Sequence, residues 1–102
     1  MPQGPIAVSN VPNPRLKSSL NITTPTVVKA GPGTILTVLV SVAGSTPGSI
    51  NDVATDAPAA GNLVCEIPNQ VGPVGGGPLN FPALNGILVV PGTGQTVSVA
   101  FQ

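Results

Sequence analysis

Apolar and polar residues alternate along several short segments of this chain, as they do in β-strands that are buried on one side. The longest such segment, residues 34–43, places Leu36, Val38, Val40 and Val42 on one face. Successive residues of a strand point to opposite sides of the sheet. We therefore expect this fully apolar face to lie in the core.

Shorter segments with strand-like patterns occur before and after this one. They cover residues 20–23, 26–29, 49–54, 63–67, 87–90 and 96–101. In residues 63–67 the pattern predicts that Leu63, Cys65 and Ile67 face the core, and in the last segment it predicts the same for Val97, Val99 and Phe101. The last two segments are separated by five residues that contain Pro and Gly, which predicts a β-hairpin.

Glycine and proline punctuate the chain between these segments. The sequence of 102 residues contains 13 Gly and 13 Pro, a content that fits turns between short strands. Residues 55–62 are expected to form an exposed loop or one helical turn, and residues 68–80 a mobile loop. Together these features predict an all-β fold, a small antiparallel β-sandwich or barrel of short strands in a single domain.

The N-terminal residues 1–18 have a different character. Their four prolines fix the backbone and remove hydrogen-bond donors, which disfavours helices and central strands. We expect an extended N-terminal arm over residues 1–18, followed by a β-sandwich domain over residues 19–102. The arm is either a floppy terminus or a segment that orders on a neighbouring subunit. In the second interpretation the candidate partner-binding residues are Ile6, Val8, Val11, Arg15, Leu16 and Lys17.

The low charge of the chain bears on its surface. Only 6% of residues are charged, the net charge is zero, and 41% are hydrophobic although only 2% are aromatic. Average proteins have about 25% charged residues, and aromatic side chains usually supply the largest buried areas. A thin aliphatic core combined with few surface charges predicts that part of the surface is covered by a partner.

Candidate catalytic and metal-binding groups are scarce. The sequence has no histidine and a single cysteine, Cys65, which is most simply a small core residue. The side-chain acids are Asp52, Asp56 and Glu66, and we expect solvated loop acids at Asp52 and Asp56 rather than a cation site. The scarcity of such side chains predicts that the protein is not an enzyme and has no cofactor or metal.

The positive charges are equally few. The sequence has only three cationic side chains, Arg15, Lys17 and Lys29, which are too few to predict nucleic-acid binding. The longest apolar run is also too short to predict a segment that crosses a membrane. All three cations precede residue 30, and all three acids lie between residues 52 and 66. This separation fits either a basic arm that reaches an acidic loop of another subunit or chance.

Residues 20–102 resemble a group of small structural proteins encoded by tailed bacteriophages. The resemblance lies in TVVKAGPG at 26–33, PGSIND at 47–52, IPNQVG at 67–72 and GILVVPGTGQTV at 86–97, of which PGTGQT is the most specific part. It implies a virion component: a capsid decoration (cement) protein that binds and stabilises the capsid lattice or, as the alternative, a head-fibre or tail-fibre module for receptor or fibre attachment.

The same resemblance implies an assembly and a location. Proteins of this group are commonly β-sandwiches assembled as homotrimers, without catalytic residues. The expected partners are the major capsid protein and further copies of the chain itself. The expected location is the capsid surface of the virion, after synthesis in the cytoplasm of the host bacterium.

Overall fold

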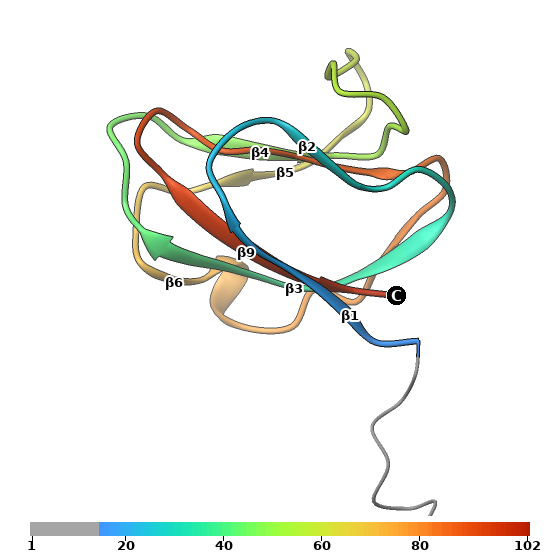
Figure 1. Ribbon diagram of the computed structural model, residues 1–102, viewed down its shortest axis with the longest axis horizontal. Helices are drawn as coiled ribbons and strands as arrows, with labels where there is room; N and C mark the ends of the chain where they lie inside the picture. Colours follow the sequence, from blue (N-terminus) through green and yellow to red (C-terminus); the bar gives the residue numbers. More distant parts are fainter. Residues whose placement is uncertain (1–14) are drawn as a thin grey trace, which may run out of the picture.

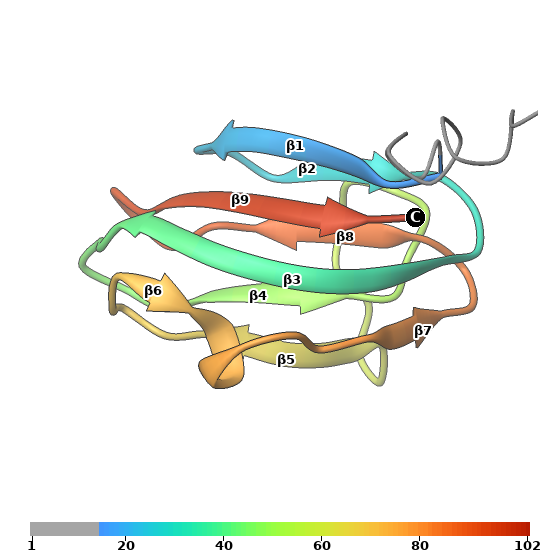
Figure 2. The ribbon, with the colours of Figure 1, turned by 90° about the horizontal axis from the view of Figure 1, so that it is seen from below.

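A computed structural model describes residues 15–102 of the chain. Nine strands in this part form two antiparallel sheets (Figures 1 and 2). In the five-stranded sheet the order is β1–β9–β3–β6, and β7 also pairs with β3. These strands are β1 (Lys17–Ile22), β3 (Gly33–Val42), β6 (Gly72–Pro73), β7 (Phe81–Ala83) and β9 (Thr96–Phe101). The four-stranded sheet has the order β2–β8–β4–β5 and consists of β2 (Thr26–Lys29), β4 (Gly48–Asn51), β5 (Leu63–Ile67) and β8 (Ile87–Val90). The predicted all-β antiparallel fold is confirmed.

The core lies between the two sheets and consists mainly of aliphatic side chains. Its fully buried members come from both sheets, mainly from their inner strands: Ile35, Val38, Val40, Ile50, Ile67, Ile87, Val89, Val97 and Val99. Phe101 is the one aromatic residue of the buried cluster in the described part. The prediction that Val97, Val99 and Phe101 face inward is confirmed, and the core has the aliphatic character that the composition indicates.

The predicted core face of β3 is partly wrong because two β-bulges interrupt the strand. Ile35 pairs with Phe101 but Thr37 pairs with Ala100, so Leu36 is an extra residue in β3. A bulge shifts the alternation by one residue, and Ile35 rather than Leu36 is fully buried. A second register shift at Ser41 leaves the side chain of Val42 51% exposed. Only Val38 and Val40 of the predicted face are core residues.

A third register shift explains a similar error in β5. Ile50 pairs with Cys65 and Asn51 with Leu63, which leaves Val64 as the extra residue. Ile67 is buried and Cys65 packs against the core, but Leu63, which was predicted to face inward, is 60% exposed.

The predicted hairpin between the last two strands is also wrong. β8 lies in the four-stranded sheet and β9 in the five-stranded sheet, so residues 91–95 cross from one sheet to the other. Gln95 anchors this crossing and is only 1% exposed. Its side-chain Oε1 accepts a hydrogen bond from the Gly92 amide at 3.0 Å, and its Nε2 donates to the Pro68 carbonyl at 2.9 Å. Backbone of Thr46 lies so close to Gly92 that a side chain there would clash.

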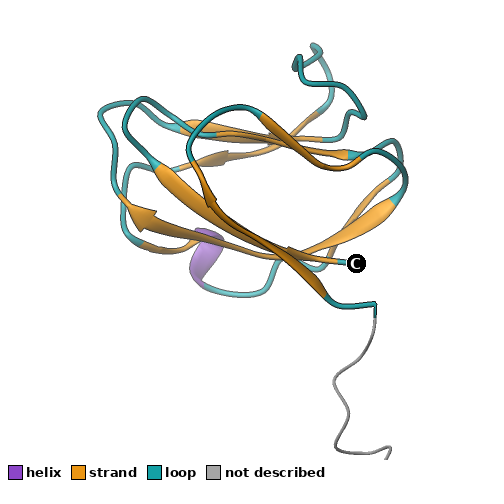
Figure 3. Ribbon diagram, in the orientation of Figure 1, coloured by secondary structure: helices purple, strands orange, loops and turns teal. Residues whose placement is uncertain are grey.

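Residues 68–80, predicted to be a mobile loop, are tied to the sandwich at several points. β6 pairs with Leu39 and Val40 of β3, and a 3-10 turn follows at Val74–Gly76 (Figure 3). The side chain of Val74 is buried in the core. The Leu79 amide donates a 2.7 Å hydrogen bond to the carbonyl of Leu36, the bulged residue of β3. The segment therefore closes one edge of the five-stranded sheet.

The expected boundary between arm and domain at residue 18 lies inside β1. Lys17 pairs with Phe101 and Ser18 with Ala100, so both residues belong to the sheet. Residues 1–14 lie outside the described part of the chain. Residues 55–62 contain no helix and form an exposed loop, which is one of the two predicted forms.

Candidate interaction surfaces

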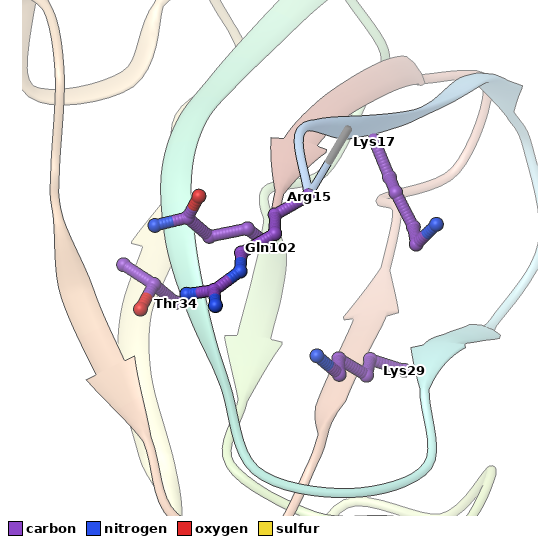
Figure 4. Close-up of a pocket in the computed structure, with 5 residues that line it drawn as sticks. All are labelled: Arg15, Lys17, Lys29, Thr34 and Gln102. Atoms are coloured by element: carbon purple, nitrogen blue, oxygen red, sulfur yellow. The ribbon is translucent and has the colours of Figure 1, made fainter. Parts of the chain in front are cut away.

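Arg15, Lys17 and Lys29, the three cations of the chain, line one pocket of about 400 Å³ together with Thr34 and Gln102 (Figure 4). The register of the five-stranded sheet explains part of this arrangement. Lys17 pairs with Phe101, and paired residues share a face of the sheet. The side chain of Lys17 therefore lies on the core-facing side of the five-stranded sheet, at one end of the core. Beside it, the Thr34 amide donates to the Gln102 carbonyl at 2.7 Å, and the Gln102 amide donates to the Thr34 carbonyl at 3.0 Å. We call this the basic pocket.

Lys29 reaches the basic pocket from the other sheet. It ends β2, the edge strand that lies beside β1 at the same edge of the sandwich (Figure 2). Its aliphatic stem packs over Gly33, where an added Cβ would stand 2.7 Å from Cδ of Lys29 and 2.6 Å from the Gln102 carbonyl oxygen. The absence of a side chain at Gly33 therefore lets Lys29 lie in this position.

A second hollow, of about 200 Å³, lies on the outer face of the five-stranded sheet. Its outward-facing residues are uncharged and come from three adjacent strands: Ser18, Leu20, Thr37, Leu39, Ser98 and Ala100. Leu20 is 66% exposed and Leu39 is 43% exposed. Exposed leucines separated only by small or hydroxyl side chains form an apolar surface without charge. We call it the apolar groove.

Asp52 was expected to be a solvated loop acid, but it stabilises a turn. Its carboxylate accepts hydrogen bonds from the Asn85 amide at 2.7 Å, the Leu84 amide at 3.1 Å and the Gly86 amide at 3.2 Å. These bonds, above all the one from Asn85, hold the pKa of Asp52 below its ordinary value, although desolvation opposes them. Asp52 therefore joins the end of β4 to the turn before β8, and its carboxylate is not available to bind a cation.

The remaining candidate groups offer little chemistry. Asp56 and Glu66 are exposed and lie on different elements, the loop after β4 and the strand β5. Cys65 packs against the core, and burial raises the pKa of its thiol, which disfavours the reactive thiolate. Among residues 15–102 there is no group of three or more His, Cys, Asp or Glu side chains that could hold a metal ion. The described part also has no helix that is long and apolar enough to span a membrane.

The structure describes three of the six candidate partner-binding residues, Arg15, Leu16 and Lys17. Arg15 and Lys17 both line the basic pocket, whereas the side chain of Leu16, which lies between them in the sequence, is exposed. Ile6, Val8 and Val11 lie outside the described residues. Sequence reasoning did not place Lys29 in one pocket with Arg15 and Lys17, and it did not place Leu20 beside Leu39 in one groove.

Comparisons with protein families, with curated proteins and with solved structures found no match for this chain.

Proposed function

We propose that this protein is a structural component of a bacteriophage virion, a capsid decoration protein that binds the major capsid protein and stabilises the capsid lattice. The single observation that best supports the proposal is the uncharged apolar groove on the outer face of the five-stranded sheet. The resemblance of residues 20–102 to small phage structural proteins supplies the identity of the partner.

The groove is suited to a protein contact. Neither Leu20 nor Leu39 is needed for the core, because the inner face of the sheet is already filled by Val38, Val40 and Val99. Burial of apolar surface stabilises a contact by about 25 cal/mol per Å², and the ordering of both partners offsets much of this gain. Attachment at many lattice positions, or as a homotrimer, raises the overall affinity through multivalency.

The proposal is tested first by the copy number of this chain in purified virions, measured by quantitative mass spectrometry. A ratio close to that of the major capsid protein is the expected result. A few copies per virion would instead favour a head-fibre or tail-fibre module, and absence from the virion would refute both functions.

A substitution experiment tests the docking face. Leu39→Glu places a charge in the apolar groove and is expected to abolish sedimentation of the protein with capsids that lack it. Leu63→Glu is the matched control, because Leu63 is exposed on the edge strand of the other sheet. Both variants should keep the unfolding temperature of the parent protein. Equal capsid binding by the two variants would contradict the proposed docking face.

A further inference from the structure

Asn85 and Gly86 form the only Asn-Gly pair of the sequence. In such a pair the peptide nitrogen of glycine can attack the side-chain Cγ of asparagine, because glycine has no side chain that hinders the approach. The nitrogen gives up its proton and bonds to Cγ, and the side-chain nitrogen of asparagine leaves as ammonia. Water then opens the cyclic imide, and an aspartate or an isoaspartate replaces the asparagine. The pair therefore has the chemistry of a spontaneous deamidation site.

The position of the pair in the fold leaves one reactant open and encloses the other. Asn85 is exposed in the turn between β7 and β8, so water reaches it and ammonia can leave. Gly86 is buried. A Cβ added at Gly86 would stand 2.6 Å from the carbonyl oxygen of Val53 and 2.9 Å from that of Lys29. The glycine is thus held between the segment after β4 and the end of β2.

The carboxylate of Asp52 binds the nitrogen on which the reaction depends. Its Oδ1 accepts a hydrogen bond from the Gly86 amide at 3.2 Å and another from the Asn85 amide at 2.7 Å. Deamidation requires the Gly86 amide to lose its proton. The carboxylate opposes this loss, because the hydrogen bond would disappear and a second negative charge would form beside the first.

We propose that Asn85–Gly86 is a deamidation site that the carboxylate of Asp52 keeps closed in the folded protein. Asp52 acts through the Gly86 amide and is a positioning residue. Its hydrogen bonds also keep its pKa low, so the carboxylate is ionised at neutral pH. The site is independent of the proposed function.

The product of the reaction does not fit the turn. Aspartate at position 85 adds a negative charge next to the carboxylate of Asp52. Isoaspartate routes the main chain through its own side chain and lengthens it, so the amides of Leu84, Asn85 and Gly86 no longer match one carboxylate. Deamidation therefore breaks the link between β4 and the turn before β8, and Asp52 delays this damage.

The test measures deamidation of the full chain at neutral pH, below its unfolding temperature. Cleavage after Glu66 releases residues 67–102, which contain Asn69, Asn80 and Asn85. Tandem mass spectrometry locates the gain in mass, and the first two asparagines serve as internal references. The same chain in guanidinium chloride gives the rate of the open site. Deamidation of Asn85 should be at least about tenfold slower in the folded chain, the rate equivalent of one hydrogen bond to a charged group. Equal rates would overturn the proposal.

A pair of variants separates Asp52 from general stability. Asp52→Ala removes the acceptor of the Gly86 amide and should speed deamidation of Asn85 in the folded chain by about tenfold. Gln95→Leu is the matched control, because the side chain of Gln95 bonds Gly92 and Pro68 in another part of the fold. It should destabilise the protein without changing the deamidation rate. Urea denaturation measures the stability of both variants. Equal acceleration in the two would overturn the proposal, because general opening of the fold would then explain the rate.

Asp52→Asn provides a test if the alanine variant does not fold. It keeps the shape of the side chain and one acceptor oxygen but removes the negative charge. Deamidation of Asn85 should then be about fivefold faster than in the parent, the difference between a hydrogen bond to a charged acceptor and one to a neutral acceptor. A folded Asp52→Asn variant that deamidates at Asn85 as slowly as the parent would overturn the role of the carboxylate.

Discussion

Gln95 and Pro68, which lie 27 residues apart in the sequence, are joined by a hydrogen bond of 2.9 Å from Nε2 of Gln95 to the carbonyl oxygen of Pro68. The other end of the same amide accepts a hydrogen bond from Gly92. One buried side chain thus fastens the crossing between β8 and β9 to the segment that follows β5. Buried polar groups are costly when they lose such partners.

Replacement of Gln95 by Leu should therefore lower the free energy of unfolding by about 1–3 kcal/mol, because the buried Gly92 amide loses its acceptor. Urea denaturation followed by circular dichroism measures the loss. Thr93→Ala is the control, since the Thr93 side chain is exposed in the same crossing and should change stability by less than about 0.5 kcal/mol. Equal stability of Gln95→Leu and the parent would show that the amide does not fasten the crossing.

Asp52 should make stability depend on pH in the acidic range. Its pKa is lowered in the folded state, so its stabilising contribution is present above the unfolded value of about 4 and is lost as the pH falls through the folded value. Asp52→Asn should cost about 1 kcal/mol at pH 7, similar to the loss of a helix cap, and should flatten the pH dependence of unfolding below the unfolded-state value of about 4.

The comparison for this prediction is Asp56→Asn, which removes a carboxylate from an exposed loop. Thermal unfolding across the same pH range should leave the acid dependence of Asp56→Asn close to that of the parent. A flattened profile in Asp56→Asn but not in Asp52→Asn would contradict the prediction, because the acid dependence would then come from Asp56 and not from Asp52.

The bulge at Leu36 can be tested by two neighbouring substitutions. Ile35→Ala removes a fully buried side chain and should cost about 2–4 kcal/mol. Leu36→Ala removes a partly buried one and should cost about 1 kcal/mol. Chemical denaturation ranks the two variants. The opposite ranking is what a strand without the bulge would give, and it would refute the register described for β3 and β9.

Val74 measures how firmly residues 68–80 are attached. Val74→Ala should lower the free energy of unfolding by about 1–3 kcal/mol because a buried side chain is shortened. Val71→Ala, in the same segment but at an exposed position, should have an effect below about 0.5 kcal/mol. If the two variants were equally stable, the segment would not contribute Val74 to the core.

The strands were predictable from the sequence wherever alternation runs without interruption. β9 is the clearest example, because every second residue, Val97, Val99 and Phe101, faces the core along the whole strand. The prediction failed at Leu36, Val42 and Leu63, where bulges change the face. A bulge depends on how a strand pairs with a partner far away in the sequence, and the local pattern does not contain that information.

The candidate site was predictable to a smaller extent. Arg15 and Lys17 lie close together in the sequence and were predicted together as partner-binding residues. Lys29 joins them only because the two sheets stack and because Gly33 has no side chain that would displace it. Likewise, Pro and Gly in residues 91–95 indicate a connection without specifying whether it stays in one sheet. The hydrogen bond from Gln95 to Pro68, which helps to hold the connection between the two sheets, joins residues far apart in the sequence and so does not show in the local pattern.

The crossing of the chain between the sheets has a consequence for the order of events during synthesis. β9 lies between β1 and β3 in one sheet, and β8 lies between β2 and β4 in the other. Both central strands therefore come from residues 87–101, whereas the strands they separate are made much earlier. Until this segment has left the ribosome, β1, β2 and β3 lack their principal partners, so the nascent chain can complete neither sheet before its last strands emerge.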